Sequence, residues 1–141
     1  MQNQRASEAT GFKIGIIFMK SRKSEQKIKW MVAEMIAAAQ EAGIHIVEAF
    51  VDRTEDFDFD REQLDPIMTR MENGEVQTVI VKSIYDISRC KDDIQTFLQW
   101  AREKDVEIIS YLGDMPLSDM TREEADNKAV SYTHLTLPTN Q

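Results

Sequence analysis

Apolar and polar positions along this chain follow two alternating patterns. Four short apolar runs, rich in β-branched residues, are typical of strands buried on both faces; they cover residues 12–19, 44–51, 79–81 and 106–112. The stretches between them carry apolar residues at every third or fourth position, which predicts helices. This alternation predicts an α/β fold, in which helices cover both faces of a three-layer, mainly parallel sheet of four to five strands.

Capping signals indicate where the intervening helices begin and end. The first helix is expected to end at Gly43, because glycine is favoured just beyond a helix C-terminus. The second should open with a capping box formed by Asp60 and Gln63 and close near Gly74. Ser88 is the predicted N-cap of the third helix.

The chain has the length of one domain. Its 141 residues, of which 42% are hydrophobic, suffice for a single core. Residues 1–11 are polar and are expected to be disordered, and residues 12–129 form the domain, with a short charged helix over residues 118–129 at its end. Residues 130–141 lack charge and helical periodicity and look like the in-frame translation of a transposase-type sequencing adapter. We therefore expect this tail to be non-native and the domain to be truncated.

Composition narrows the classes of function. The net charge of −8 argues against a broad basic surface for nucleic acid, although it leaves room for a local basic cluster in a cleft. No run approaches the ~18 apolar residues of a membrane span, and the single Cys90 fits a reducing cytoplasm. His45 and His134, the two histidines, have no ligand spacing, so neither a metal site nor a cofactor is expected.

Cationic and hydroxyl side chains follow the predicted strands where each strand ends. The loop after the first strand lacks the glycines of a dinucleotide fold or a P-loop and the clustered carboxylates of a receiver domain. Because the carboxyl ends of parallel strands meet at one edge, we expect the polar groups of three loops to converge there. Guanidinium groups beside a hydroxyl suit a phosphodiester, while an ordinary solvated surface is the alternative. The predicted catalytic residues are Ser21, Ser24, Arg61 and Arg89, and the predicted substrate-binding residues are Lys20, Arg22 and Lys82.

Several motifs of this chain resemble those of the serine recombinases, the resolvase and invertase family. Residues 84–89, Ile-Tyr-Asp-Ile-Ser-Arg, resemble the central signature of that family, Leu-Asp-Arg-Leu-Ser/Gly-Arg after an apolar strand. Residues 14–26 are similar to its opening segment, Tyr-x-Arg-Val-Ser-Ser/Thr-x-x-Gln, and Arg61 matches its middle arginine. The similarity extends over about residues 12–112 in the same order and spacing.

Two departures from the family pattern bear on activity. Tyr85 and Asp86 stand where the signature has Asp-Arg, so a carboxylate replaces one arginine. Without a gap, Arg22 or Lys20 occupies the nucleophile position, whereas a two-residue shift brings Ser24 there. The nucleophile is therefore not fixed by the alignment.

The resemblance implies a domain for DNA strand exchange. In this family a serine attacks the DNA backbone to make a phosphoserine link, an arginine cluster activates it, and no metal takes part. The resemblance also implies DNA as a partner, bound weakly or through a missing C-terminal region, and a homodimer or higher homo-oligomer. We expect strand exchange to be impaired or inactive in this chain, with Ser21 or Ser24 as the available nucleophile. The alternatives are a non-catalytic interaction or regulatory domain that retains the fold, and an unrelated α/β binding module.

Overall fold

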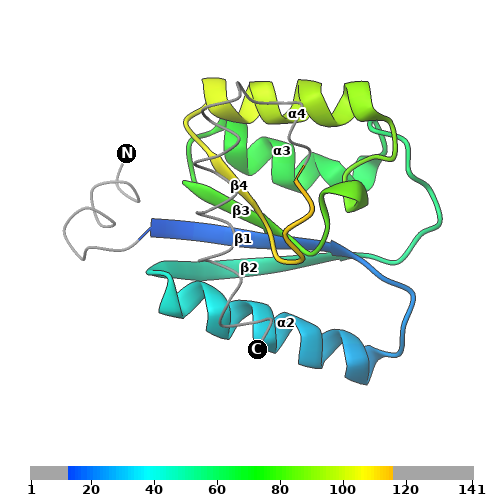
Figure 1. The fold of residues 1–141 in the computed structure, drawn as a ribbon, viewed down its shortest axis with the longest axis vertical. Helices are drawn as coiled ribbons and strands as arrows, with labels where there is room; N and C mark the ends of the chain where they lie inside the picture. The colour runs from blue at the N-terminus through cyan, green and yellow to red at the C-terminus, as the bar shows by residue number, and fades with distance from the viewer. Residues whose placement is uncertain (1–12, 116–141) are drawn as a thin grey trace.

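The computed structural model describes residues 13–115, and its centre is a four-stranded sheet in the order β2-β1-β3-β4 (Figure 1). All neighbouring strands in this sheet are parallel. Their carboxyl ends therefore lie at one edge of the sheet, as predicted. The strands are β1 (Lys13–Lys20), β2 (Ile44–Asp52), β3 (Thr78–Val81) and β4 (Glu107–Ser110).

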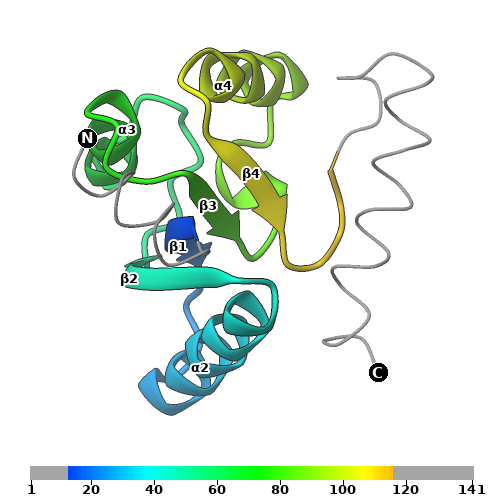
Figure 2. The same ribbon diagram turned by 90° about the vertical axis from the view of Figure 1, so that its left-hand side faces the viewer.

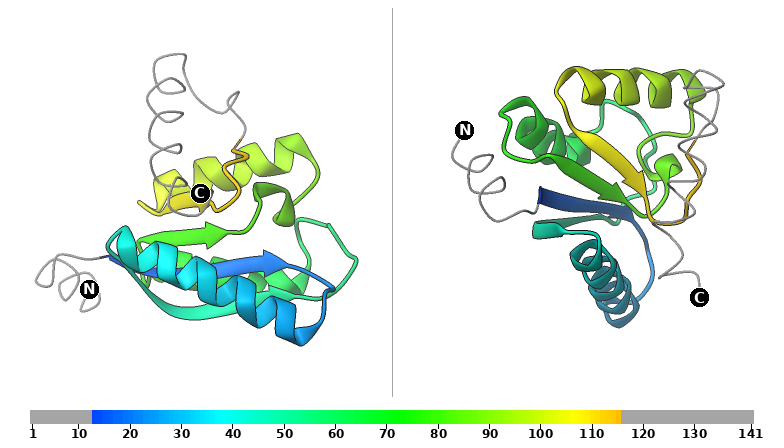
Figure 3. Two further views of the ribbon diagram at one scale, coloured as in Figure 1. Left: turned by 60° about the horizontal axis from the view of Figure 1, so that its bottom comes forward. Right: turned by 60° about the vertical axis from the view of Figure 1, so that its left-hand side comes forward.

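Helices cover both faces of the sheet, which confirms the three-layer α/β fold. On one face lies α2 (Glu25–Glu41), and on the other lie α3 (Asp65–Glu72) and α4 (Lys91–Glu103) (Figure 2 and Figure 3). Two short 3₁₀ helices, η1 (Glu62–Leu64) and η2 (Ile84–Asp86), precede α3 and α4. The sequence pattern did not predict them, because a three-residue helix is too short to show a period.

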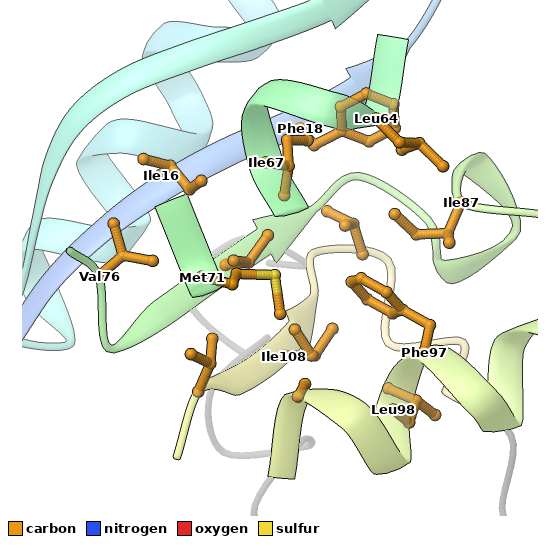
Figure 4. Close-up of a cluster of buried hydrophobic side chains, with 14 of the residues drawn as sticks. Ile16, Phe18, Leu64, Ile67, Met71, Val76, Ile87, Phe97, Leu98 and Ile108 are labelled. Atoms are coloured by element: carbon orange, nitrogen blue, oxygen red, sulfur yellow. The ribbon is translucent and has the colours of Figure 1, made fainter. Parts of the chain in front are cut away.

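The burial of β1 follows from its central position in the sheet. Ile16, Ile17 and Phe18 are each 0% exposed, since β1 has a strand on either side and helices on both faces. Successive side chains of a strand point to opposite faces. Ile16 and Phe18 therefore join the core beneath α3 and α4, whereas Ile17 and Met19 join the core beneath α2. Figure 4 shows the first of these cores, where side chains of β1, α3 and α4 gather.

The predicted helix ends are partly confirmed. Gly43 and Gly74 follow α2 and α3 with φ angles of 79° and 70°, the left-handed conformation that glycine adopts at low cost. The capping box of Asp60 and Gln63 is wrong. The 3₁₀ helix η1 begins after Arg61 instead, with no side-chain cap.

The predicted cap of α4 is also wrong. Cys90, not Ser88, is the N-cap residue, because the turn after η2 delays the start of this helix. The Ser88 hydroxyl donates to Asp93 Oδ2 at 3.1 Å and accepts from the Cys90 N–H at 3.0 Å. Ser88 thus organises the turn that precedes the helix.

Several expectations lie outside the described residues, namely the disordered segment 1–11, the last helix over 118–129 and the tail 130–141. They stay predictions. None of the helices within residues 13–115 has the length and the apolar content that a membrane crossing requires.

Gly15 allows three strands to approach closely. A Cβ atom on this residue would lie 2.8 Å from Ile44 Cγ2, 3.2 Å from the Thr78 carbonyl oxygen and 3.3 Å from Ile46 Cδ1. The register between β1 and β2 also shifts between Gly15 and Ile16. A side chain at this position would push apart the strands whose ends carry the candidate site.

We predict that Gly15→Ala lowers the free energy of unfolding by about 1–3 kcal/mol, because the Thr78 carbonyl is backbone and cannot move aside without shifting β3. Urea denaturation followed by circular dichroism measures this loss. Gly43→Ala is a contrasting variant: no atom lies within 4 Å of its Cβ position, so its loss reports only the strain of a φ of 79°, which Gly15 does not have. A Gly15→Ala variant as stable as the native chain would contradict the proposed close approach.

Candidate functional site

Three loops meet at the carboxyl edge of the sheet and surround a cavity of about 460 Å³, which we call the rim cavity. The loops follow β1, β2 and β3, and they come together because the strands are parallel. Four of the predicted site residues line the rim cavity, and three do not. Its lining consists of Lys20, Ser21, Arg22, Thr54, Glu55, Phe57 and Arg89.

Lys20 closes the inner side of the rim cavity and is 7% exposed. Its Nζ donates to Asp52 Oδ2 at 3.1 Å, to the Thr54 carbonyl oxygen at 2.7 Å and to Thr54 Oγ1 at 3.2 Å. All three donors of the ammonium group are therefore engaged. Lys20 fastens the end of β1 to the end of β2.

Arg61 is buried beside the rim cavity rather than in it, with a side chain that is 1% exposed. Its Nε donates to Asp52 Oδ2 at 2.8 Å. Its Nη1 donates to the carbonyl oxygens of Asp58 and Ile87, each at 2.8 Å, and Nη2 donates to that of Asp86. These bonds use four of the five N–H groups of a guanidinium. Arg61 therefore joins the loop after β2 to the loop after β3.

Asp52 is the carboxylate that Lys20 and Arg61 share, and its side chain is 0% exposed. Burial by itself would raise the pKa of Asp52, but hydrogen bonds from Thr54, Arg61 and Lys20 outweigh it and lower the pKa to about 2. Asp52 is thus ionised at neutral pH. Asp52 was not among the predicted site residues, because its place beside Lys20 depends on the register between β1 and β2.

Arg89 lines the rim cavity with its guanidinium stacked on an aromatic ring. Its Cζ lies 3.8 Å from the centroid of Phe57, and the Lys20 Nζ lies 4.6 Å from the same centroid. No carboxylate within residues 13–115 forms an ion pair with Arg89. Stacking occupies the face of the guanidinium and leaves the N–H groups at its edge available to a ligand. Phe57, like Asp52, was not among the predicted site residues.

Arg22 lines the same cavity and forms an ion pair with Glu55. The two side chains are 63% and 74% exposed. An ion pair this exposed contributes little, because water screens it. Arg22 can therefore exchange Glu55 for another anion at small cost.

The two candidate serines have different environments. Ser21 lines the rim cavity and is 9% exposed; its Oγ accepts from the Lys23 N–H at 3.2 Å. The Ser21 N–H donates to the Asp52 carbonyl oxygen at 3.0 Å, which fixes the backbone. Ser24 is the N-cap of α2, where its Oγ accepts from the Lys27 N–H at 3.3 Å, and it does not line the cavity.

Lys82 and Asp86 tie the loop after β3 to the end of β1. The Lys82 Nζ donates to the Lys20 carbonyl oxygen at 3.1 Å, and Asp86 Oδ2 accepts from the Lys20 N–H at 2.9 Å. Burial raises the pKa of Asp86, and Asp114 adds to the rise, while the Lys20 N–H and the charge of Lys82 oppose it. Both side chains position the loops, and neither lines the rim cavity.

No group of three or more His, Cys, Asp or Glu side chains among residues 13–115 is arranged to hold a metal ion. The chemistry that the rim cavity offers is that of a hydroxyl beside arginine and lysine. Such a set of groups binds an anion and stabilises negative charge as it develops.

Comparison with known proteins finds a matching family model and solved structures with a similar fold. The family model described as the N-terminal domain of resolvase matches residues 20–129. Among solved structures, the N-terminal catalytic domain of TP901-1 integrase has a TM-score of 0.62 at 16% identity, covering 91% of this chain and 95% of that chain. A resolvase family site-specific recombinase from Streptococcus pneumoniae has a TM-score of 0.60 at 19% identity, covering 86% and 87%.

A third structure is the C-terminal catalytic domain of ISC1926 TnpA, an IS607-like serine recombinase, with a TM-score of 0.60 at 16% identity and coverage of 75% and 73%. No curated protein has a sequence close enough to match. At these identities the structures share the fold, while the family model extends over more than half of the sequence. This chain therefore belongs to the resolvase family of site-specific serine recombinases and carries the N-terminal domain of that family.

Proposed function

We propose that this domain binds one phosphodiester group of DNA in the rim cavity, with Arg89 as the principal contact and Ser21 as the nucleophile. The observation that carries the proposal is that an arginine without a carboxylate partner among residues 13–115 lines the same cavity as a serine hydroxyl. An arginine edge binds two phosphate oxygens at once, which both holds and orients the group.

The reaction proposed for Ser21 is a transesterification. Its Oγ bonds to phosphorus, one P–O bond to a deoxyribose oxygen breaks, and the departing oxygen takes up the proton of the serine. The step needs neither water nor an oxidant, and it leaves a phosphoserine link. Arg22 and Arg89 stabilise the charge that develops on the phosphorus oxygens. We assign this role to Ser21 and not to Ser24, because the Ser24 hydroxyl caps α2 and does not line the cavity.

A second candidate function is a non-catalytic domain that keeps the fold and binds its partner without cleaving DNA. Two positions of the family pattern favour this function, because neither supplies a free arginine to the rim cavity. Arg61, which matches the middle arginine of the pattern, gives its donors to the protein interior. Asp86 places a buried carboxylate where the signature has an arginine.

The wider setting follows from the family. Resolvase-family domains bind DNA and act as oligomers. We infer that this chain works as a homodimer or higher homo-oligomer and that its site of action is the cytoplasm, where its DNA substrate would lie. DNA bound through this domain alone would be held weakly, because a single cavity makes few phosphate contacts.

We predict that the full chain forms a covalent adduct with DNA that is lost in Ser21→Ala and retained in Ser24→Ala. The chain is incubated with end-labelled duplexes of randomised sequence, and the products are separated by denaturing electrophoresis. The covalent adduct is a labelled band that migrates more slowly than free DNA and disappears after protease treatment. Ser24→Ala is the matched control, because it removes a hydroxyl of the same loop that does not line the cavity. Absence of an adduct from the native chain would sink the nucleophile assignment and favour the non-catalytic domain.

We predict that Phe57→Leu weakens DNA binding about 3- to 10-fold, because Arg89 loses the ring that holds its guanidinium. Fluorescence anisotropy of a labelled short duplex at low salt measures the affinity. Phe57→Tyr keeps the ring and should retain native affinity. Phe59→Leu is the control in the same loop, since the Phe59 ring packs edge-to-face on Phe97 at 6.2 Å and lines no part of the cavity. Equal losses in Phe57→Leu and Phe59→Leu would contradict a specific role for Phe57.

We predict that Arg61→Lys and Arg89→Lys separate stability from binding. Arg61→Lys should lower the free energy of unfolding by about 2–4 kcal/mol, because a single ammonium cannot satisfy the carbonyls and the carboxylate that Arg61 bonds. Its acid unfolding should also begin at higher pH, since Asp52 loses a donor that keeps its pKa low. Arg89→Lys should unfold like the native chain and bind DNA less tightly.

Chemical denaturation and anisotropy, measured on the same preparations, check both halves of this prediction. Native stability in Arg61→Lys would contradict the structural role of Arg61. Native DNA affinity in Arg89→Lys would contradict its role as the phosphate contact.

A further inference from the structure

We propose that a second site adjoins the rim cavity and holds an unpaired nucleotide of the DNA strand. It is a hollow of about 370 Å³, which we call the lysine groove, between α2 and the ends of β1 and β3. The inference rests on the proposed function, because it extends the path of the same strand. The described lining is Met19, Ser21, Lys23, Lys27, Ile28, Trp30, Met31, Glu34 and Lys82.

The two hollows are neighbours because Ser21 lines both of them. A strand whose phosphodiester lies in the rim cavity against Ser21 therefore has the lysine groove directly beside it. The first turn of α2 follows the loop that carries this serine, and α2 runs along the sheet from there (Figure 3). Continuity at Ser21 is the first argument for a shared ligand.

The charge of the lysine groove is the second argument. Lys23 and Lys27 are exposed, Lys82 is half-buried, and Glu34 is the one carboxylate in the described lining. The chain as a whole carries a net charge of −8, so the groove has the opposite sign to the average surface. A local excess of lysine of this kind attracts a phosphate backbone.

Trp30 supplies the third argument. It is 62% exposed, although burial of an indole ring is strongly favourable, and the apolar stripe of α2 packs on the sheet without it. On the helix, Lys27, Trp30 and Glu34 are spaced at three and four residues and lie on one face. An exposed aromatic ring next to lysines is the arrangement on which a nucleobase stacks while its phosphate is neutralised.

Stacking requires a base whose face is free. In duplex DNA the faces of the bases are covered by their neighbours, so a duplex would gain only the lysine contacts. An unpaired nucleotide gains both contributions, and stacking on an aromatic side chain is worth about 1–3 kcal/mol per base. The lysine groove is therefore a seat for single-stranded DNA, of the sort that arises beside a broken strand.

Tryptophan fluorescence tests this proposal directly, because the chain has two tryptophans and they lie on opposite faces of the sheet. Trp30 is on α2, while Trp100 is on α4. We would titrate the full-length Trp100→Phe and Trp30→Phe variants at low salt with an unlabelled oligothymidine of about six nucleotides. We expect saturable quenching in Trp100→Phe and none in Trp30→Phe. In the Trp100→Phe background, Lys27→Gln should remove one phosphate contact. The slope of the logarithm of the binding constant against the logarithm of the salt concentration should then become less steep by about 0.7.

The possible outcomes separate this inference from the proposed function. In the Trp100→Phe background, Arg89→Lys should raise the oligothymidine concentration that half-saturates the quenching; quenching that still reaches the same final value, while inorganic phosphate fails to compete, supports a distinct seat for the base. Absence of quenching in Trp100→Phe, or equal quenching by a duplex of the same length, would overturn it. An adduct through Ser21 without quenching contradicts only the lysine groove, whereas quenching without an adduct contradicts only the proposed nucleophile.

Discussion

The carboxylate of Asp52 holds together the loops on which the candidate site depends. It accepts hydrogen bonds from Lys20 at the end of β1 and from Arg61 in the loop after β2. Arg61 in turn reaches the backbone carbonyls of Asp86 and Ile87 after β3. Buried charges are costly unless they are paired and hydrogen-bonded. Here Lys20 and Arg61 share one carboxylate, so buried ion pairs set the geometry of the rim cavity, whose inner side Lys20 lines.

This arrangement divides the arginines by task. Arg61 and Arg89 were both predicted to be catalytic. Arg61 donates its hydrogen bonds to the protein, whereas the N–H groups of Arg89 remain available to a ligand. The difference follows from the partner that each guanidinium has. Hydrogen bonds to carbonyls and a carboxylate consume the edge of the group, whereas stacking on Phe57 consumes only its face. Burial and partner together therefore say more about the role of an arginine than its match to a family pattern.

The strands, their shared edge and the meeting of three loops were predictable, because apolar periodicity is local and parallel strands end on one side. The partners of side chains were not. That Lys20 lies beside Asp52 depends on the register between β1 and β2, which no periodicity encodes. Ser24 precedes a helix, so its capping role was readable from sequence and was overlooked. Phe57 lies between Asp56 and Asp58. This context predicts a loop but gives no sign that the Phe57 ring supports the guanidinium of Arg89.

The net negative charge of the chain contrasts with the cationic side chains at the carboxyl edge of the sheet. A protein with a net charge of −8 repels DNA on average, so attraction must come from places where cations outnumber carboxylates. The rim cavity and the lysine groove are such places, and both include Ser21. The proposed binding of DNA at these two places would bring the strand to the surroundings of one hydroxyl. Repulsion between DNA and an acidic chain would then favour this placement of the strand over binding elsewhere.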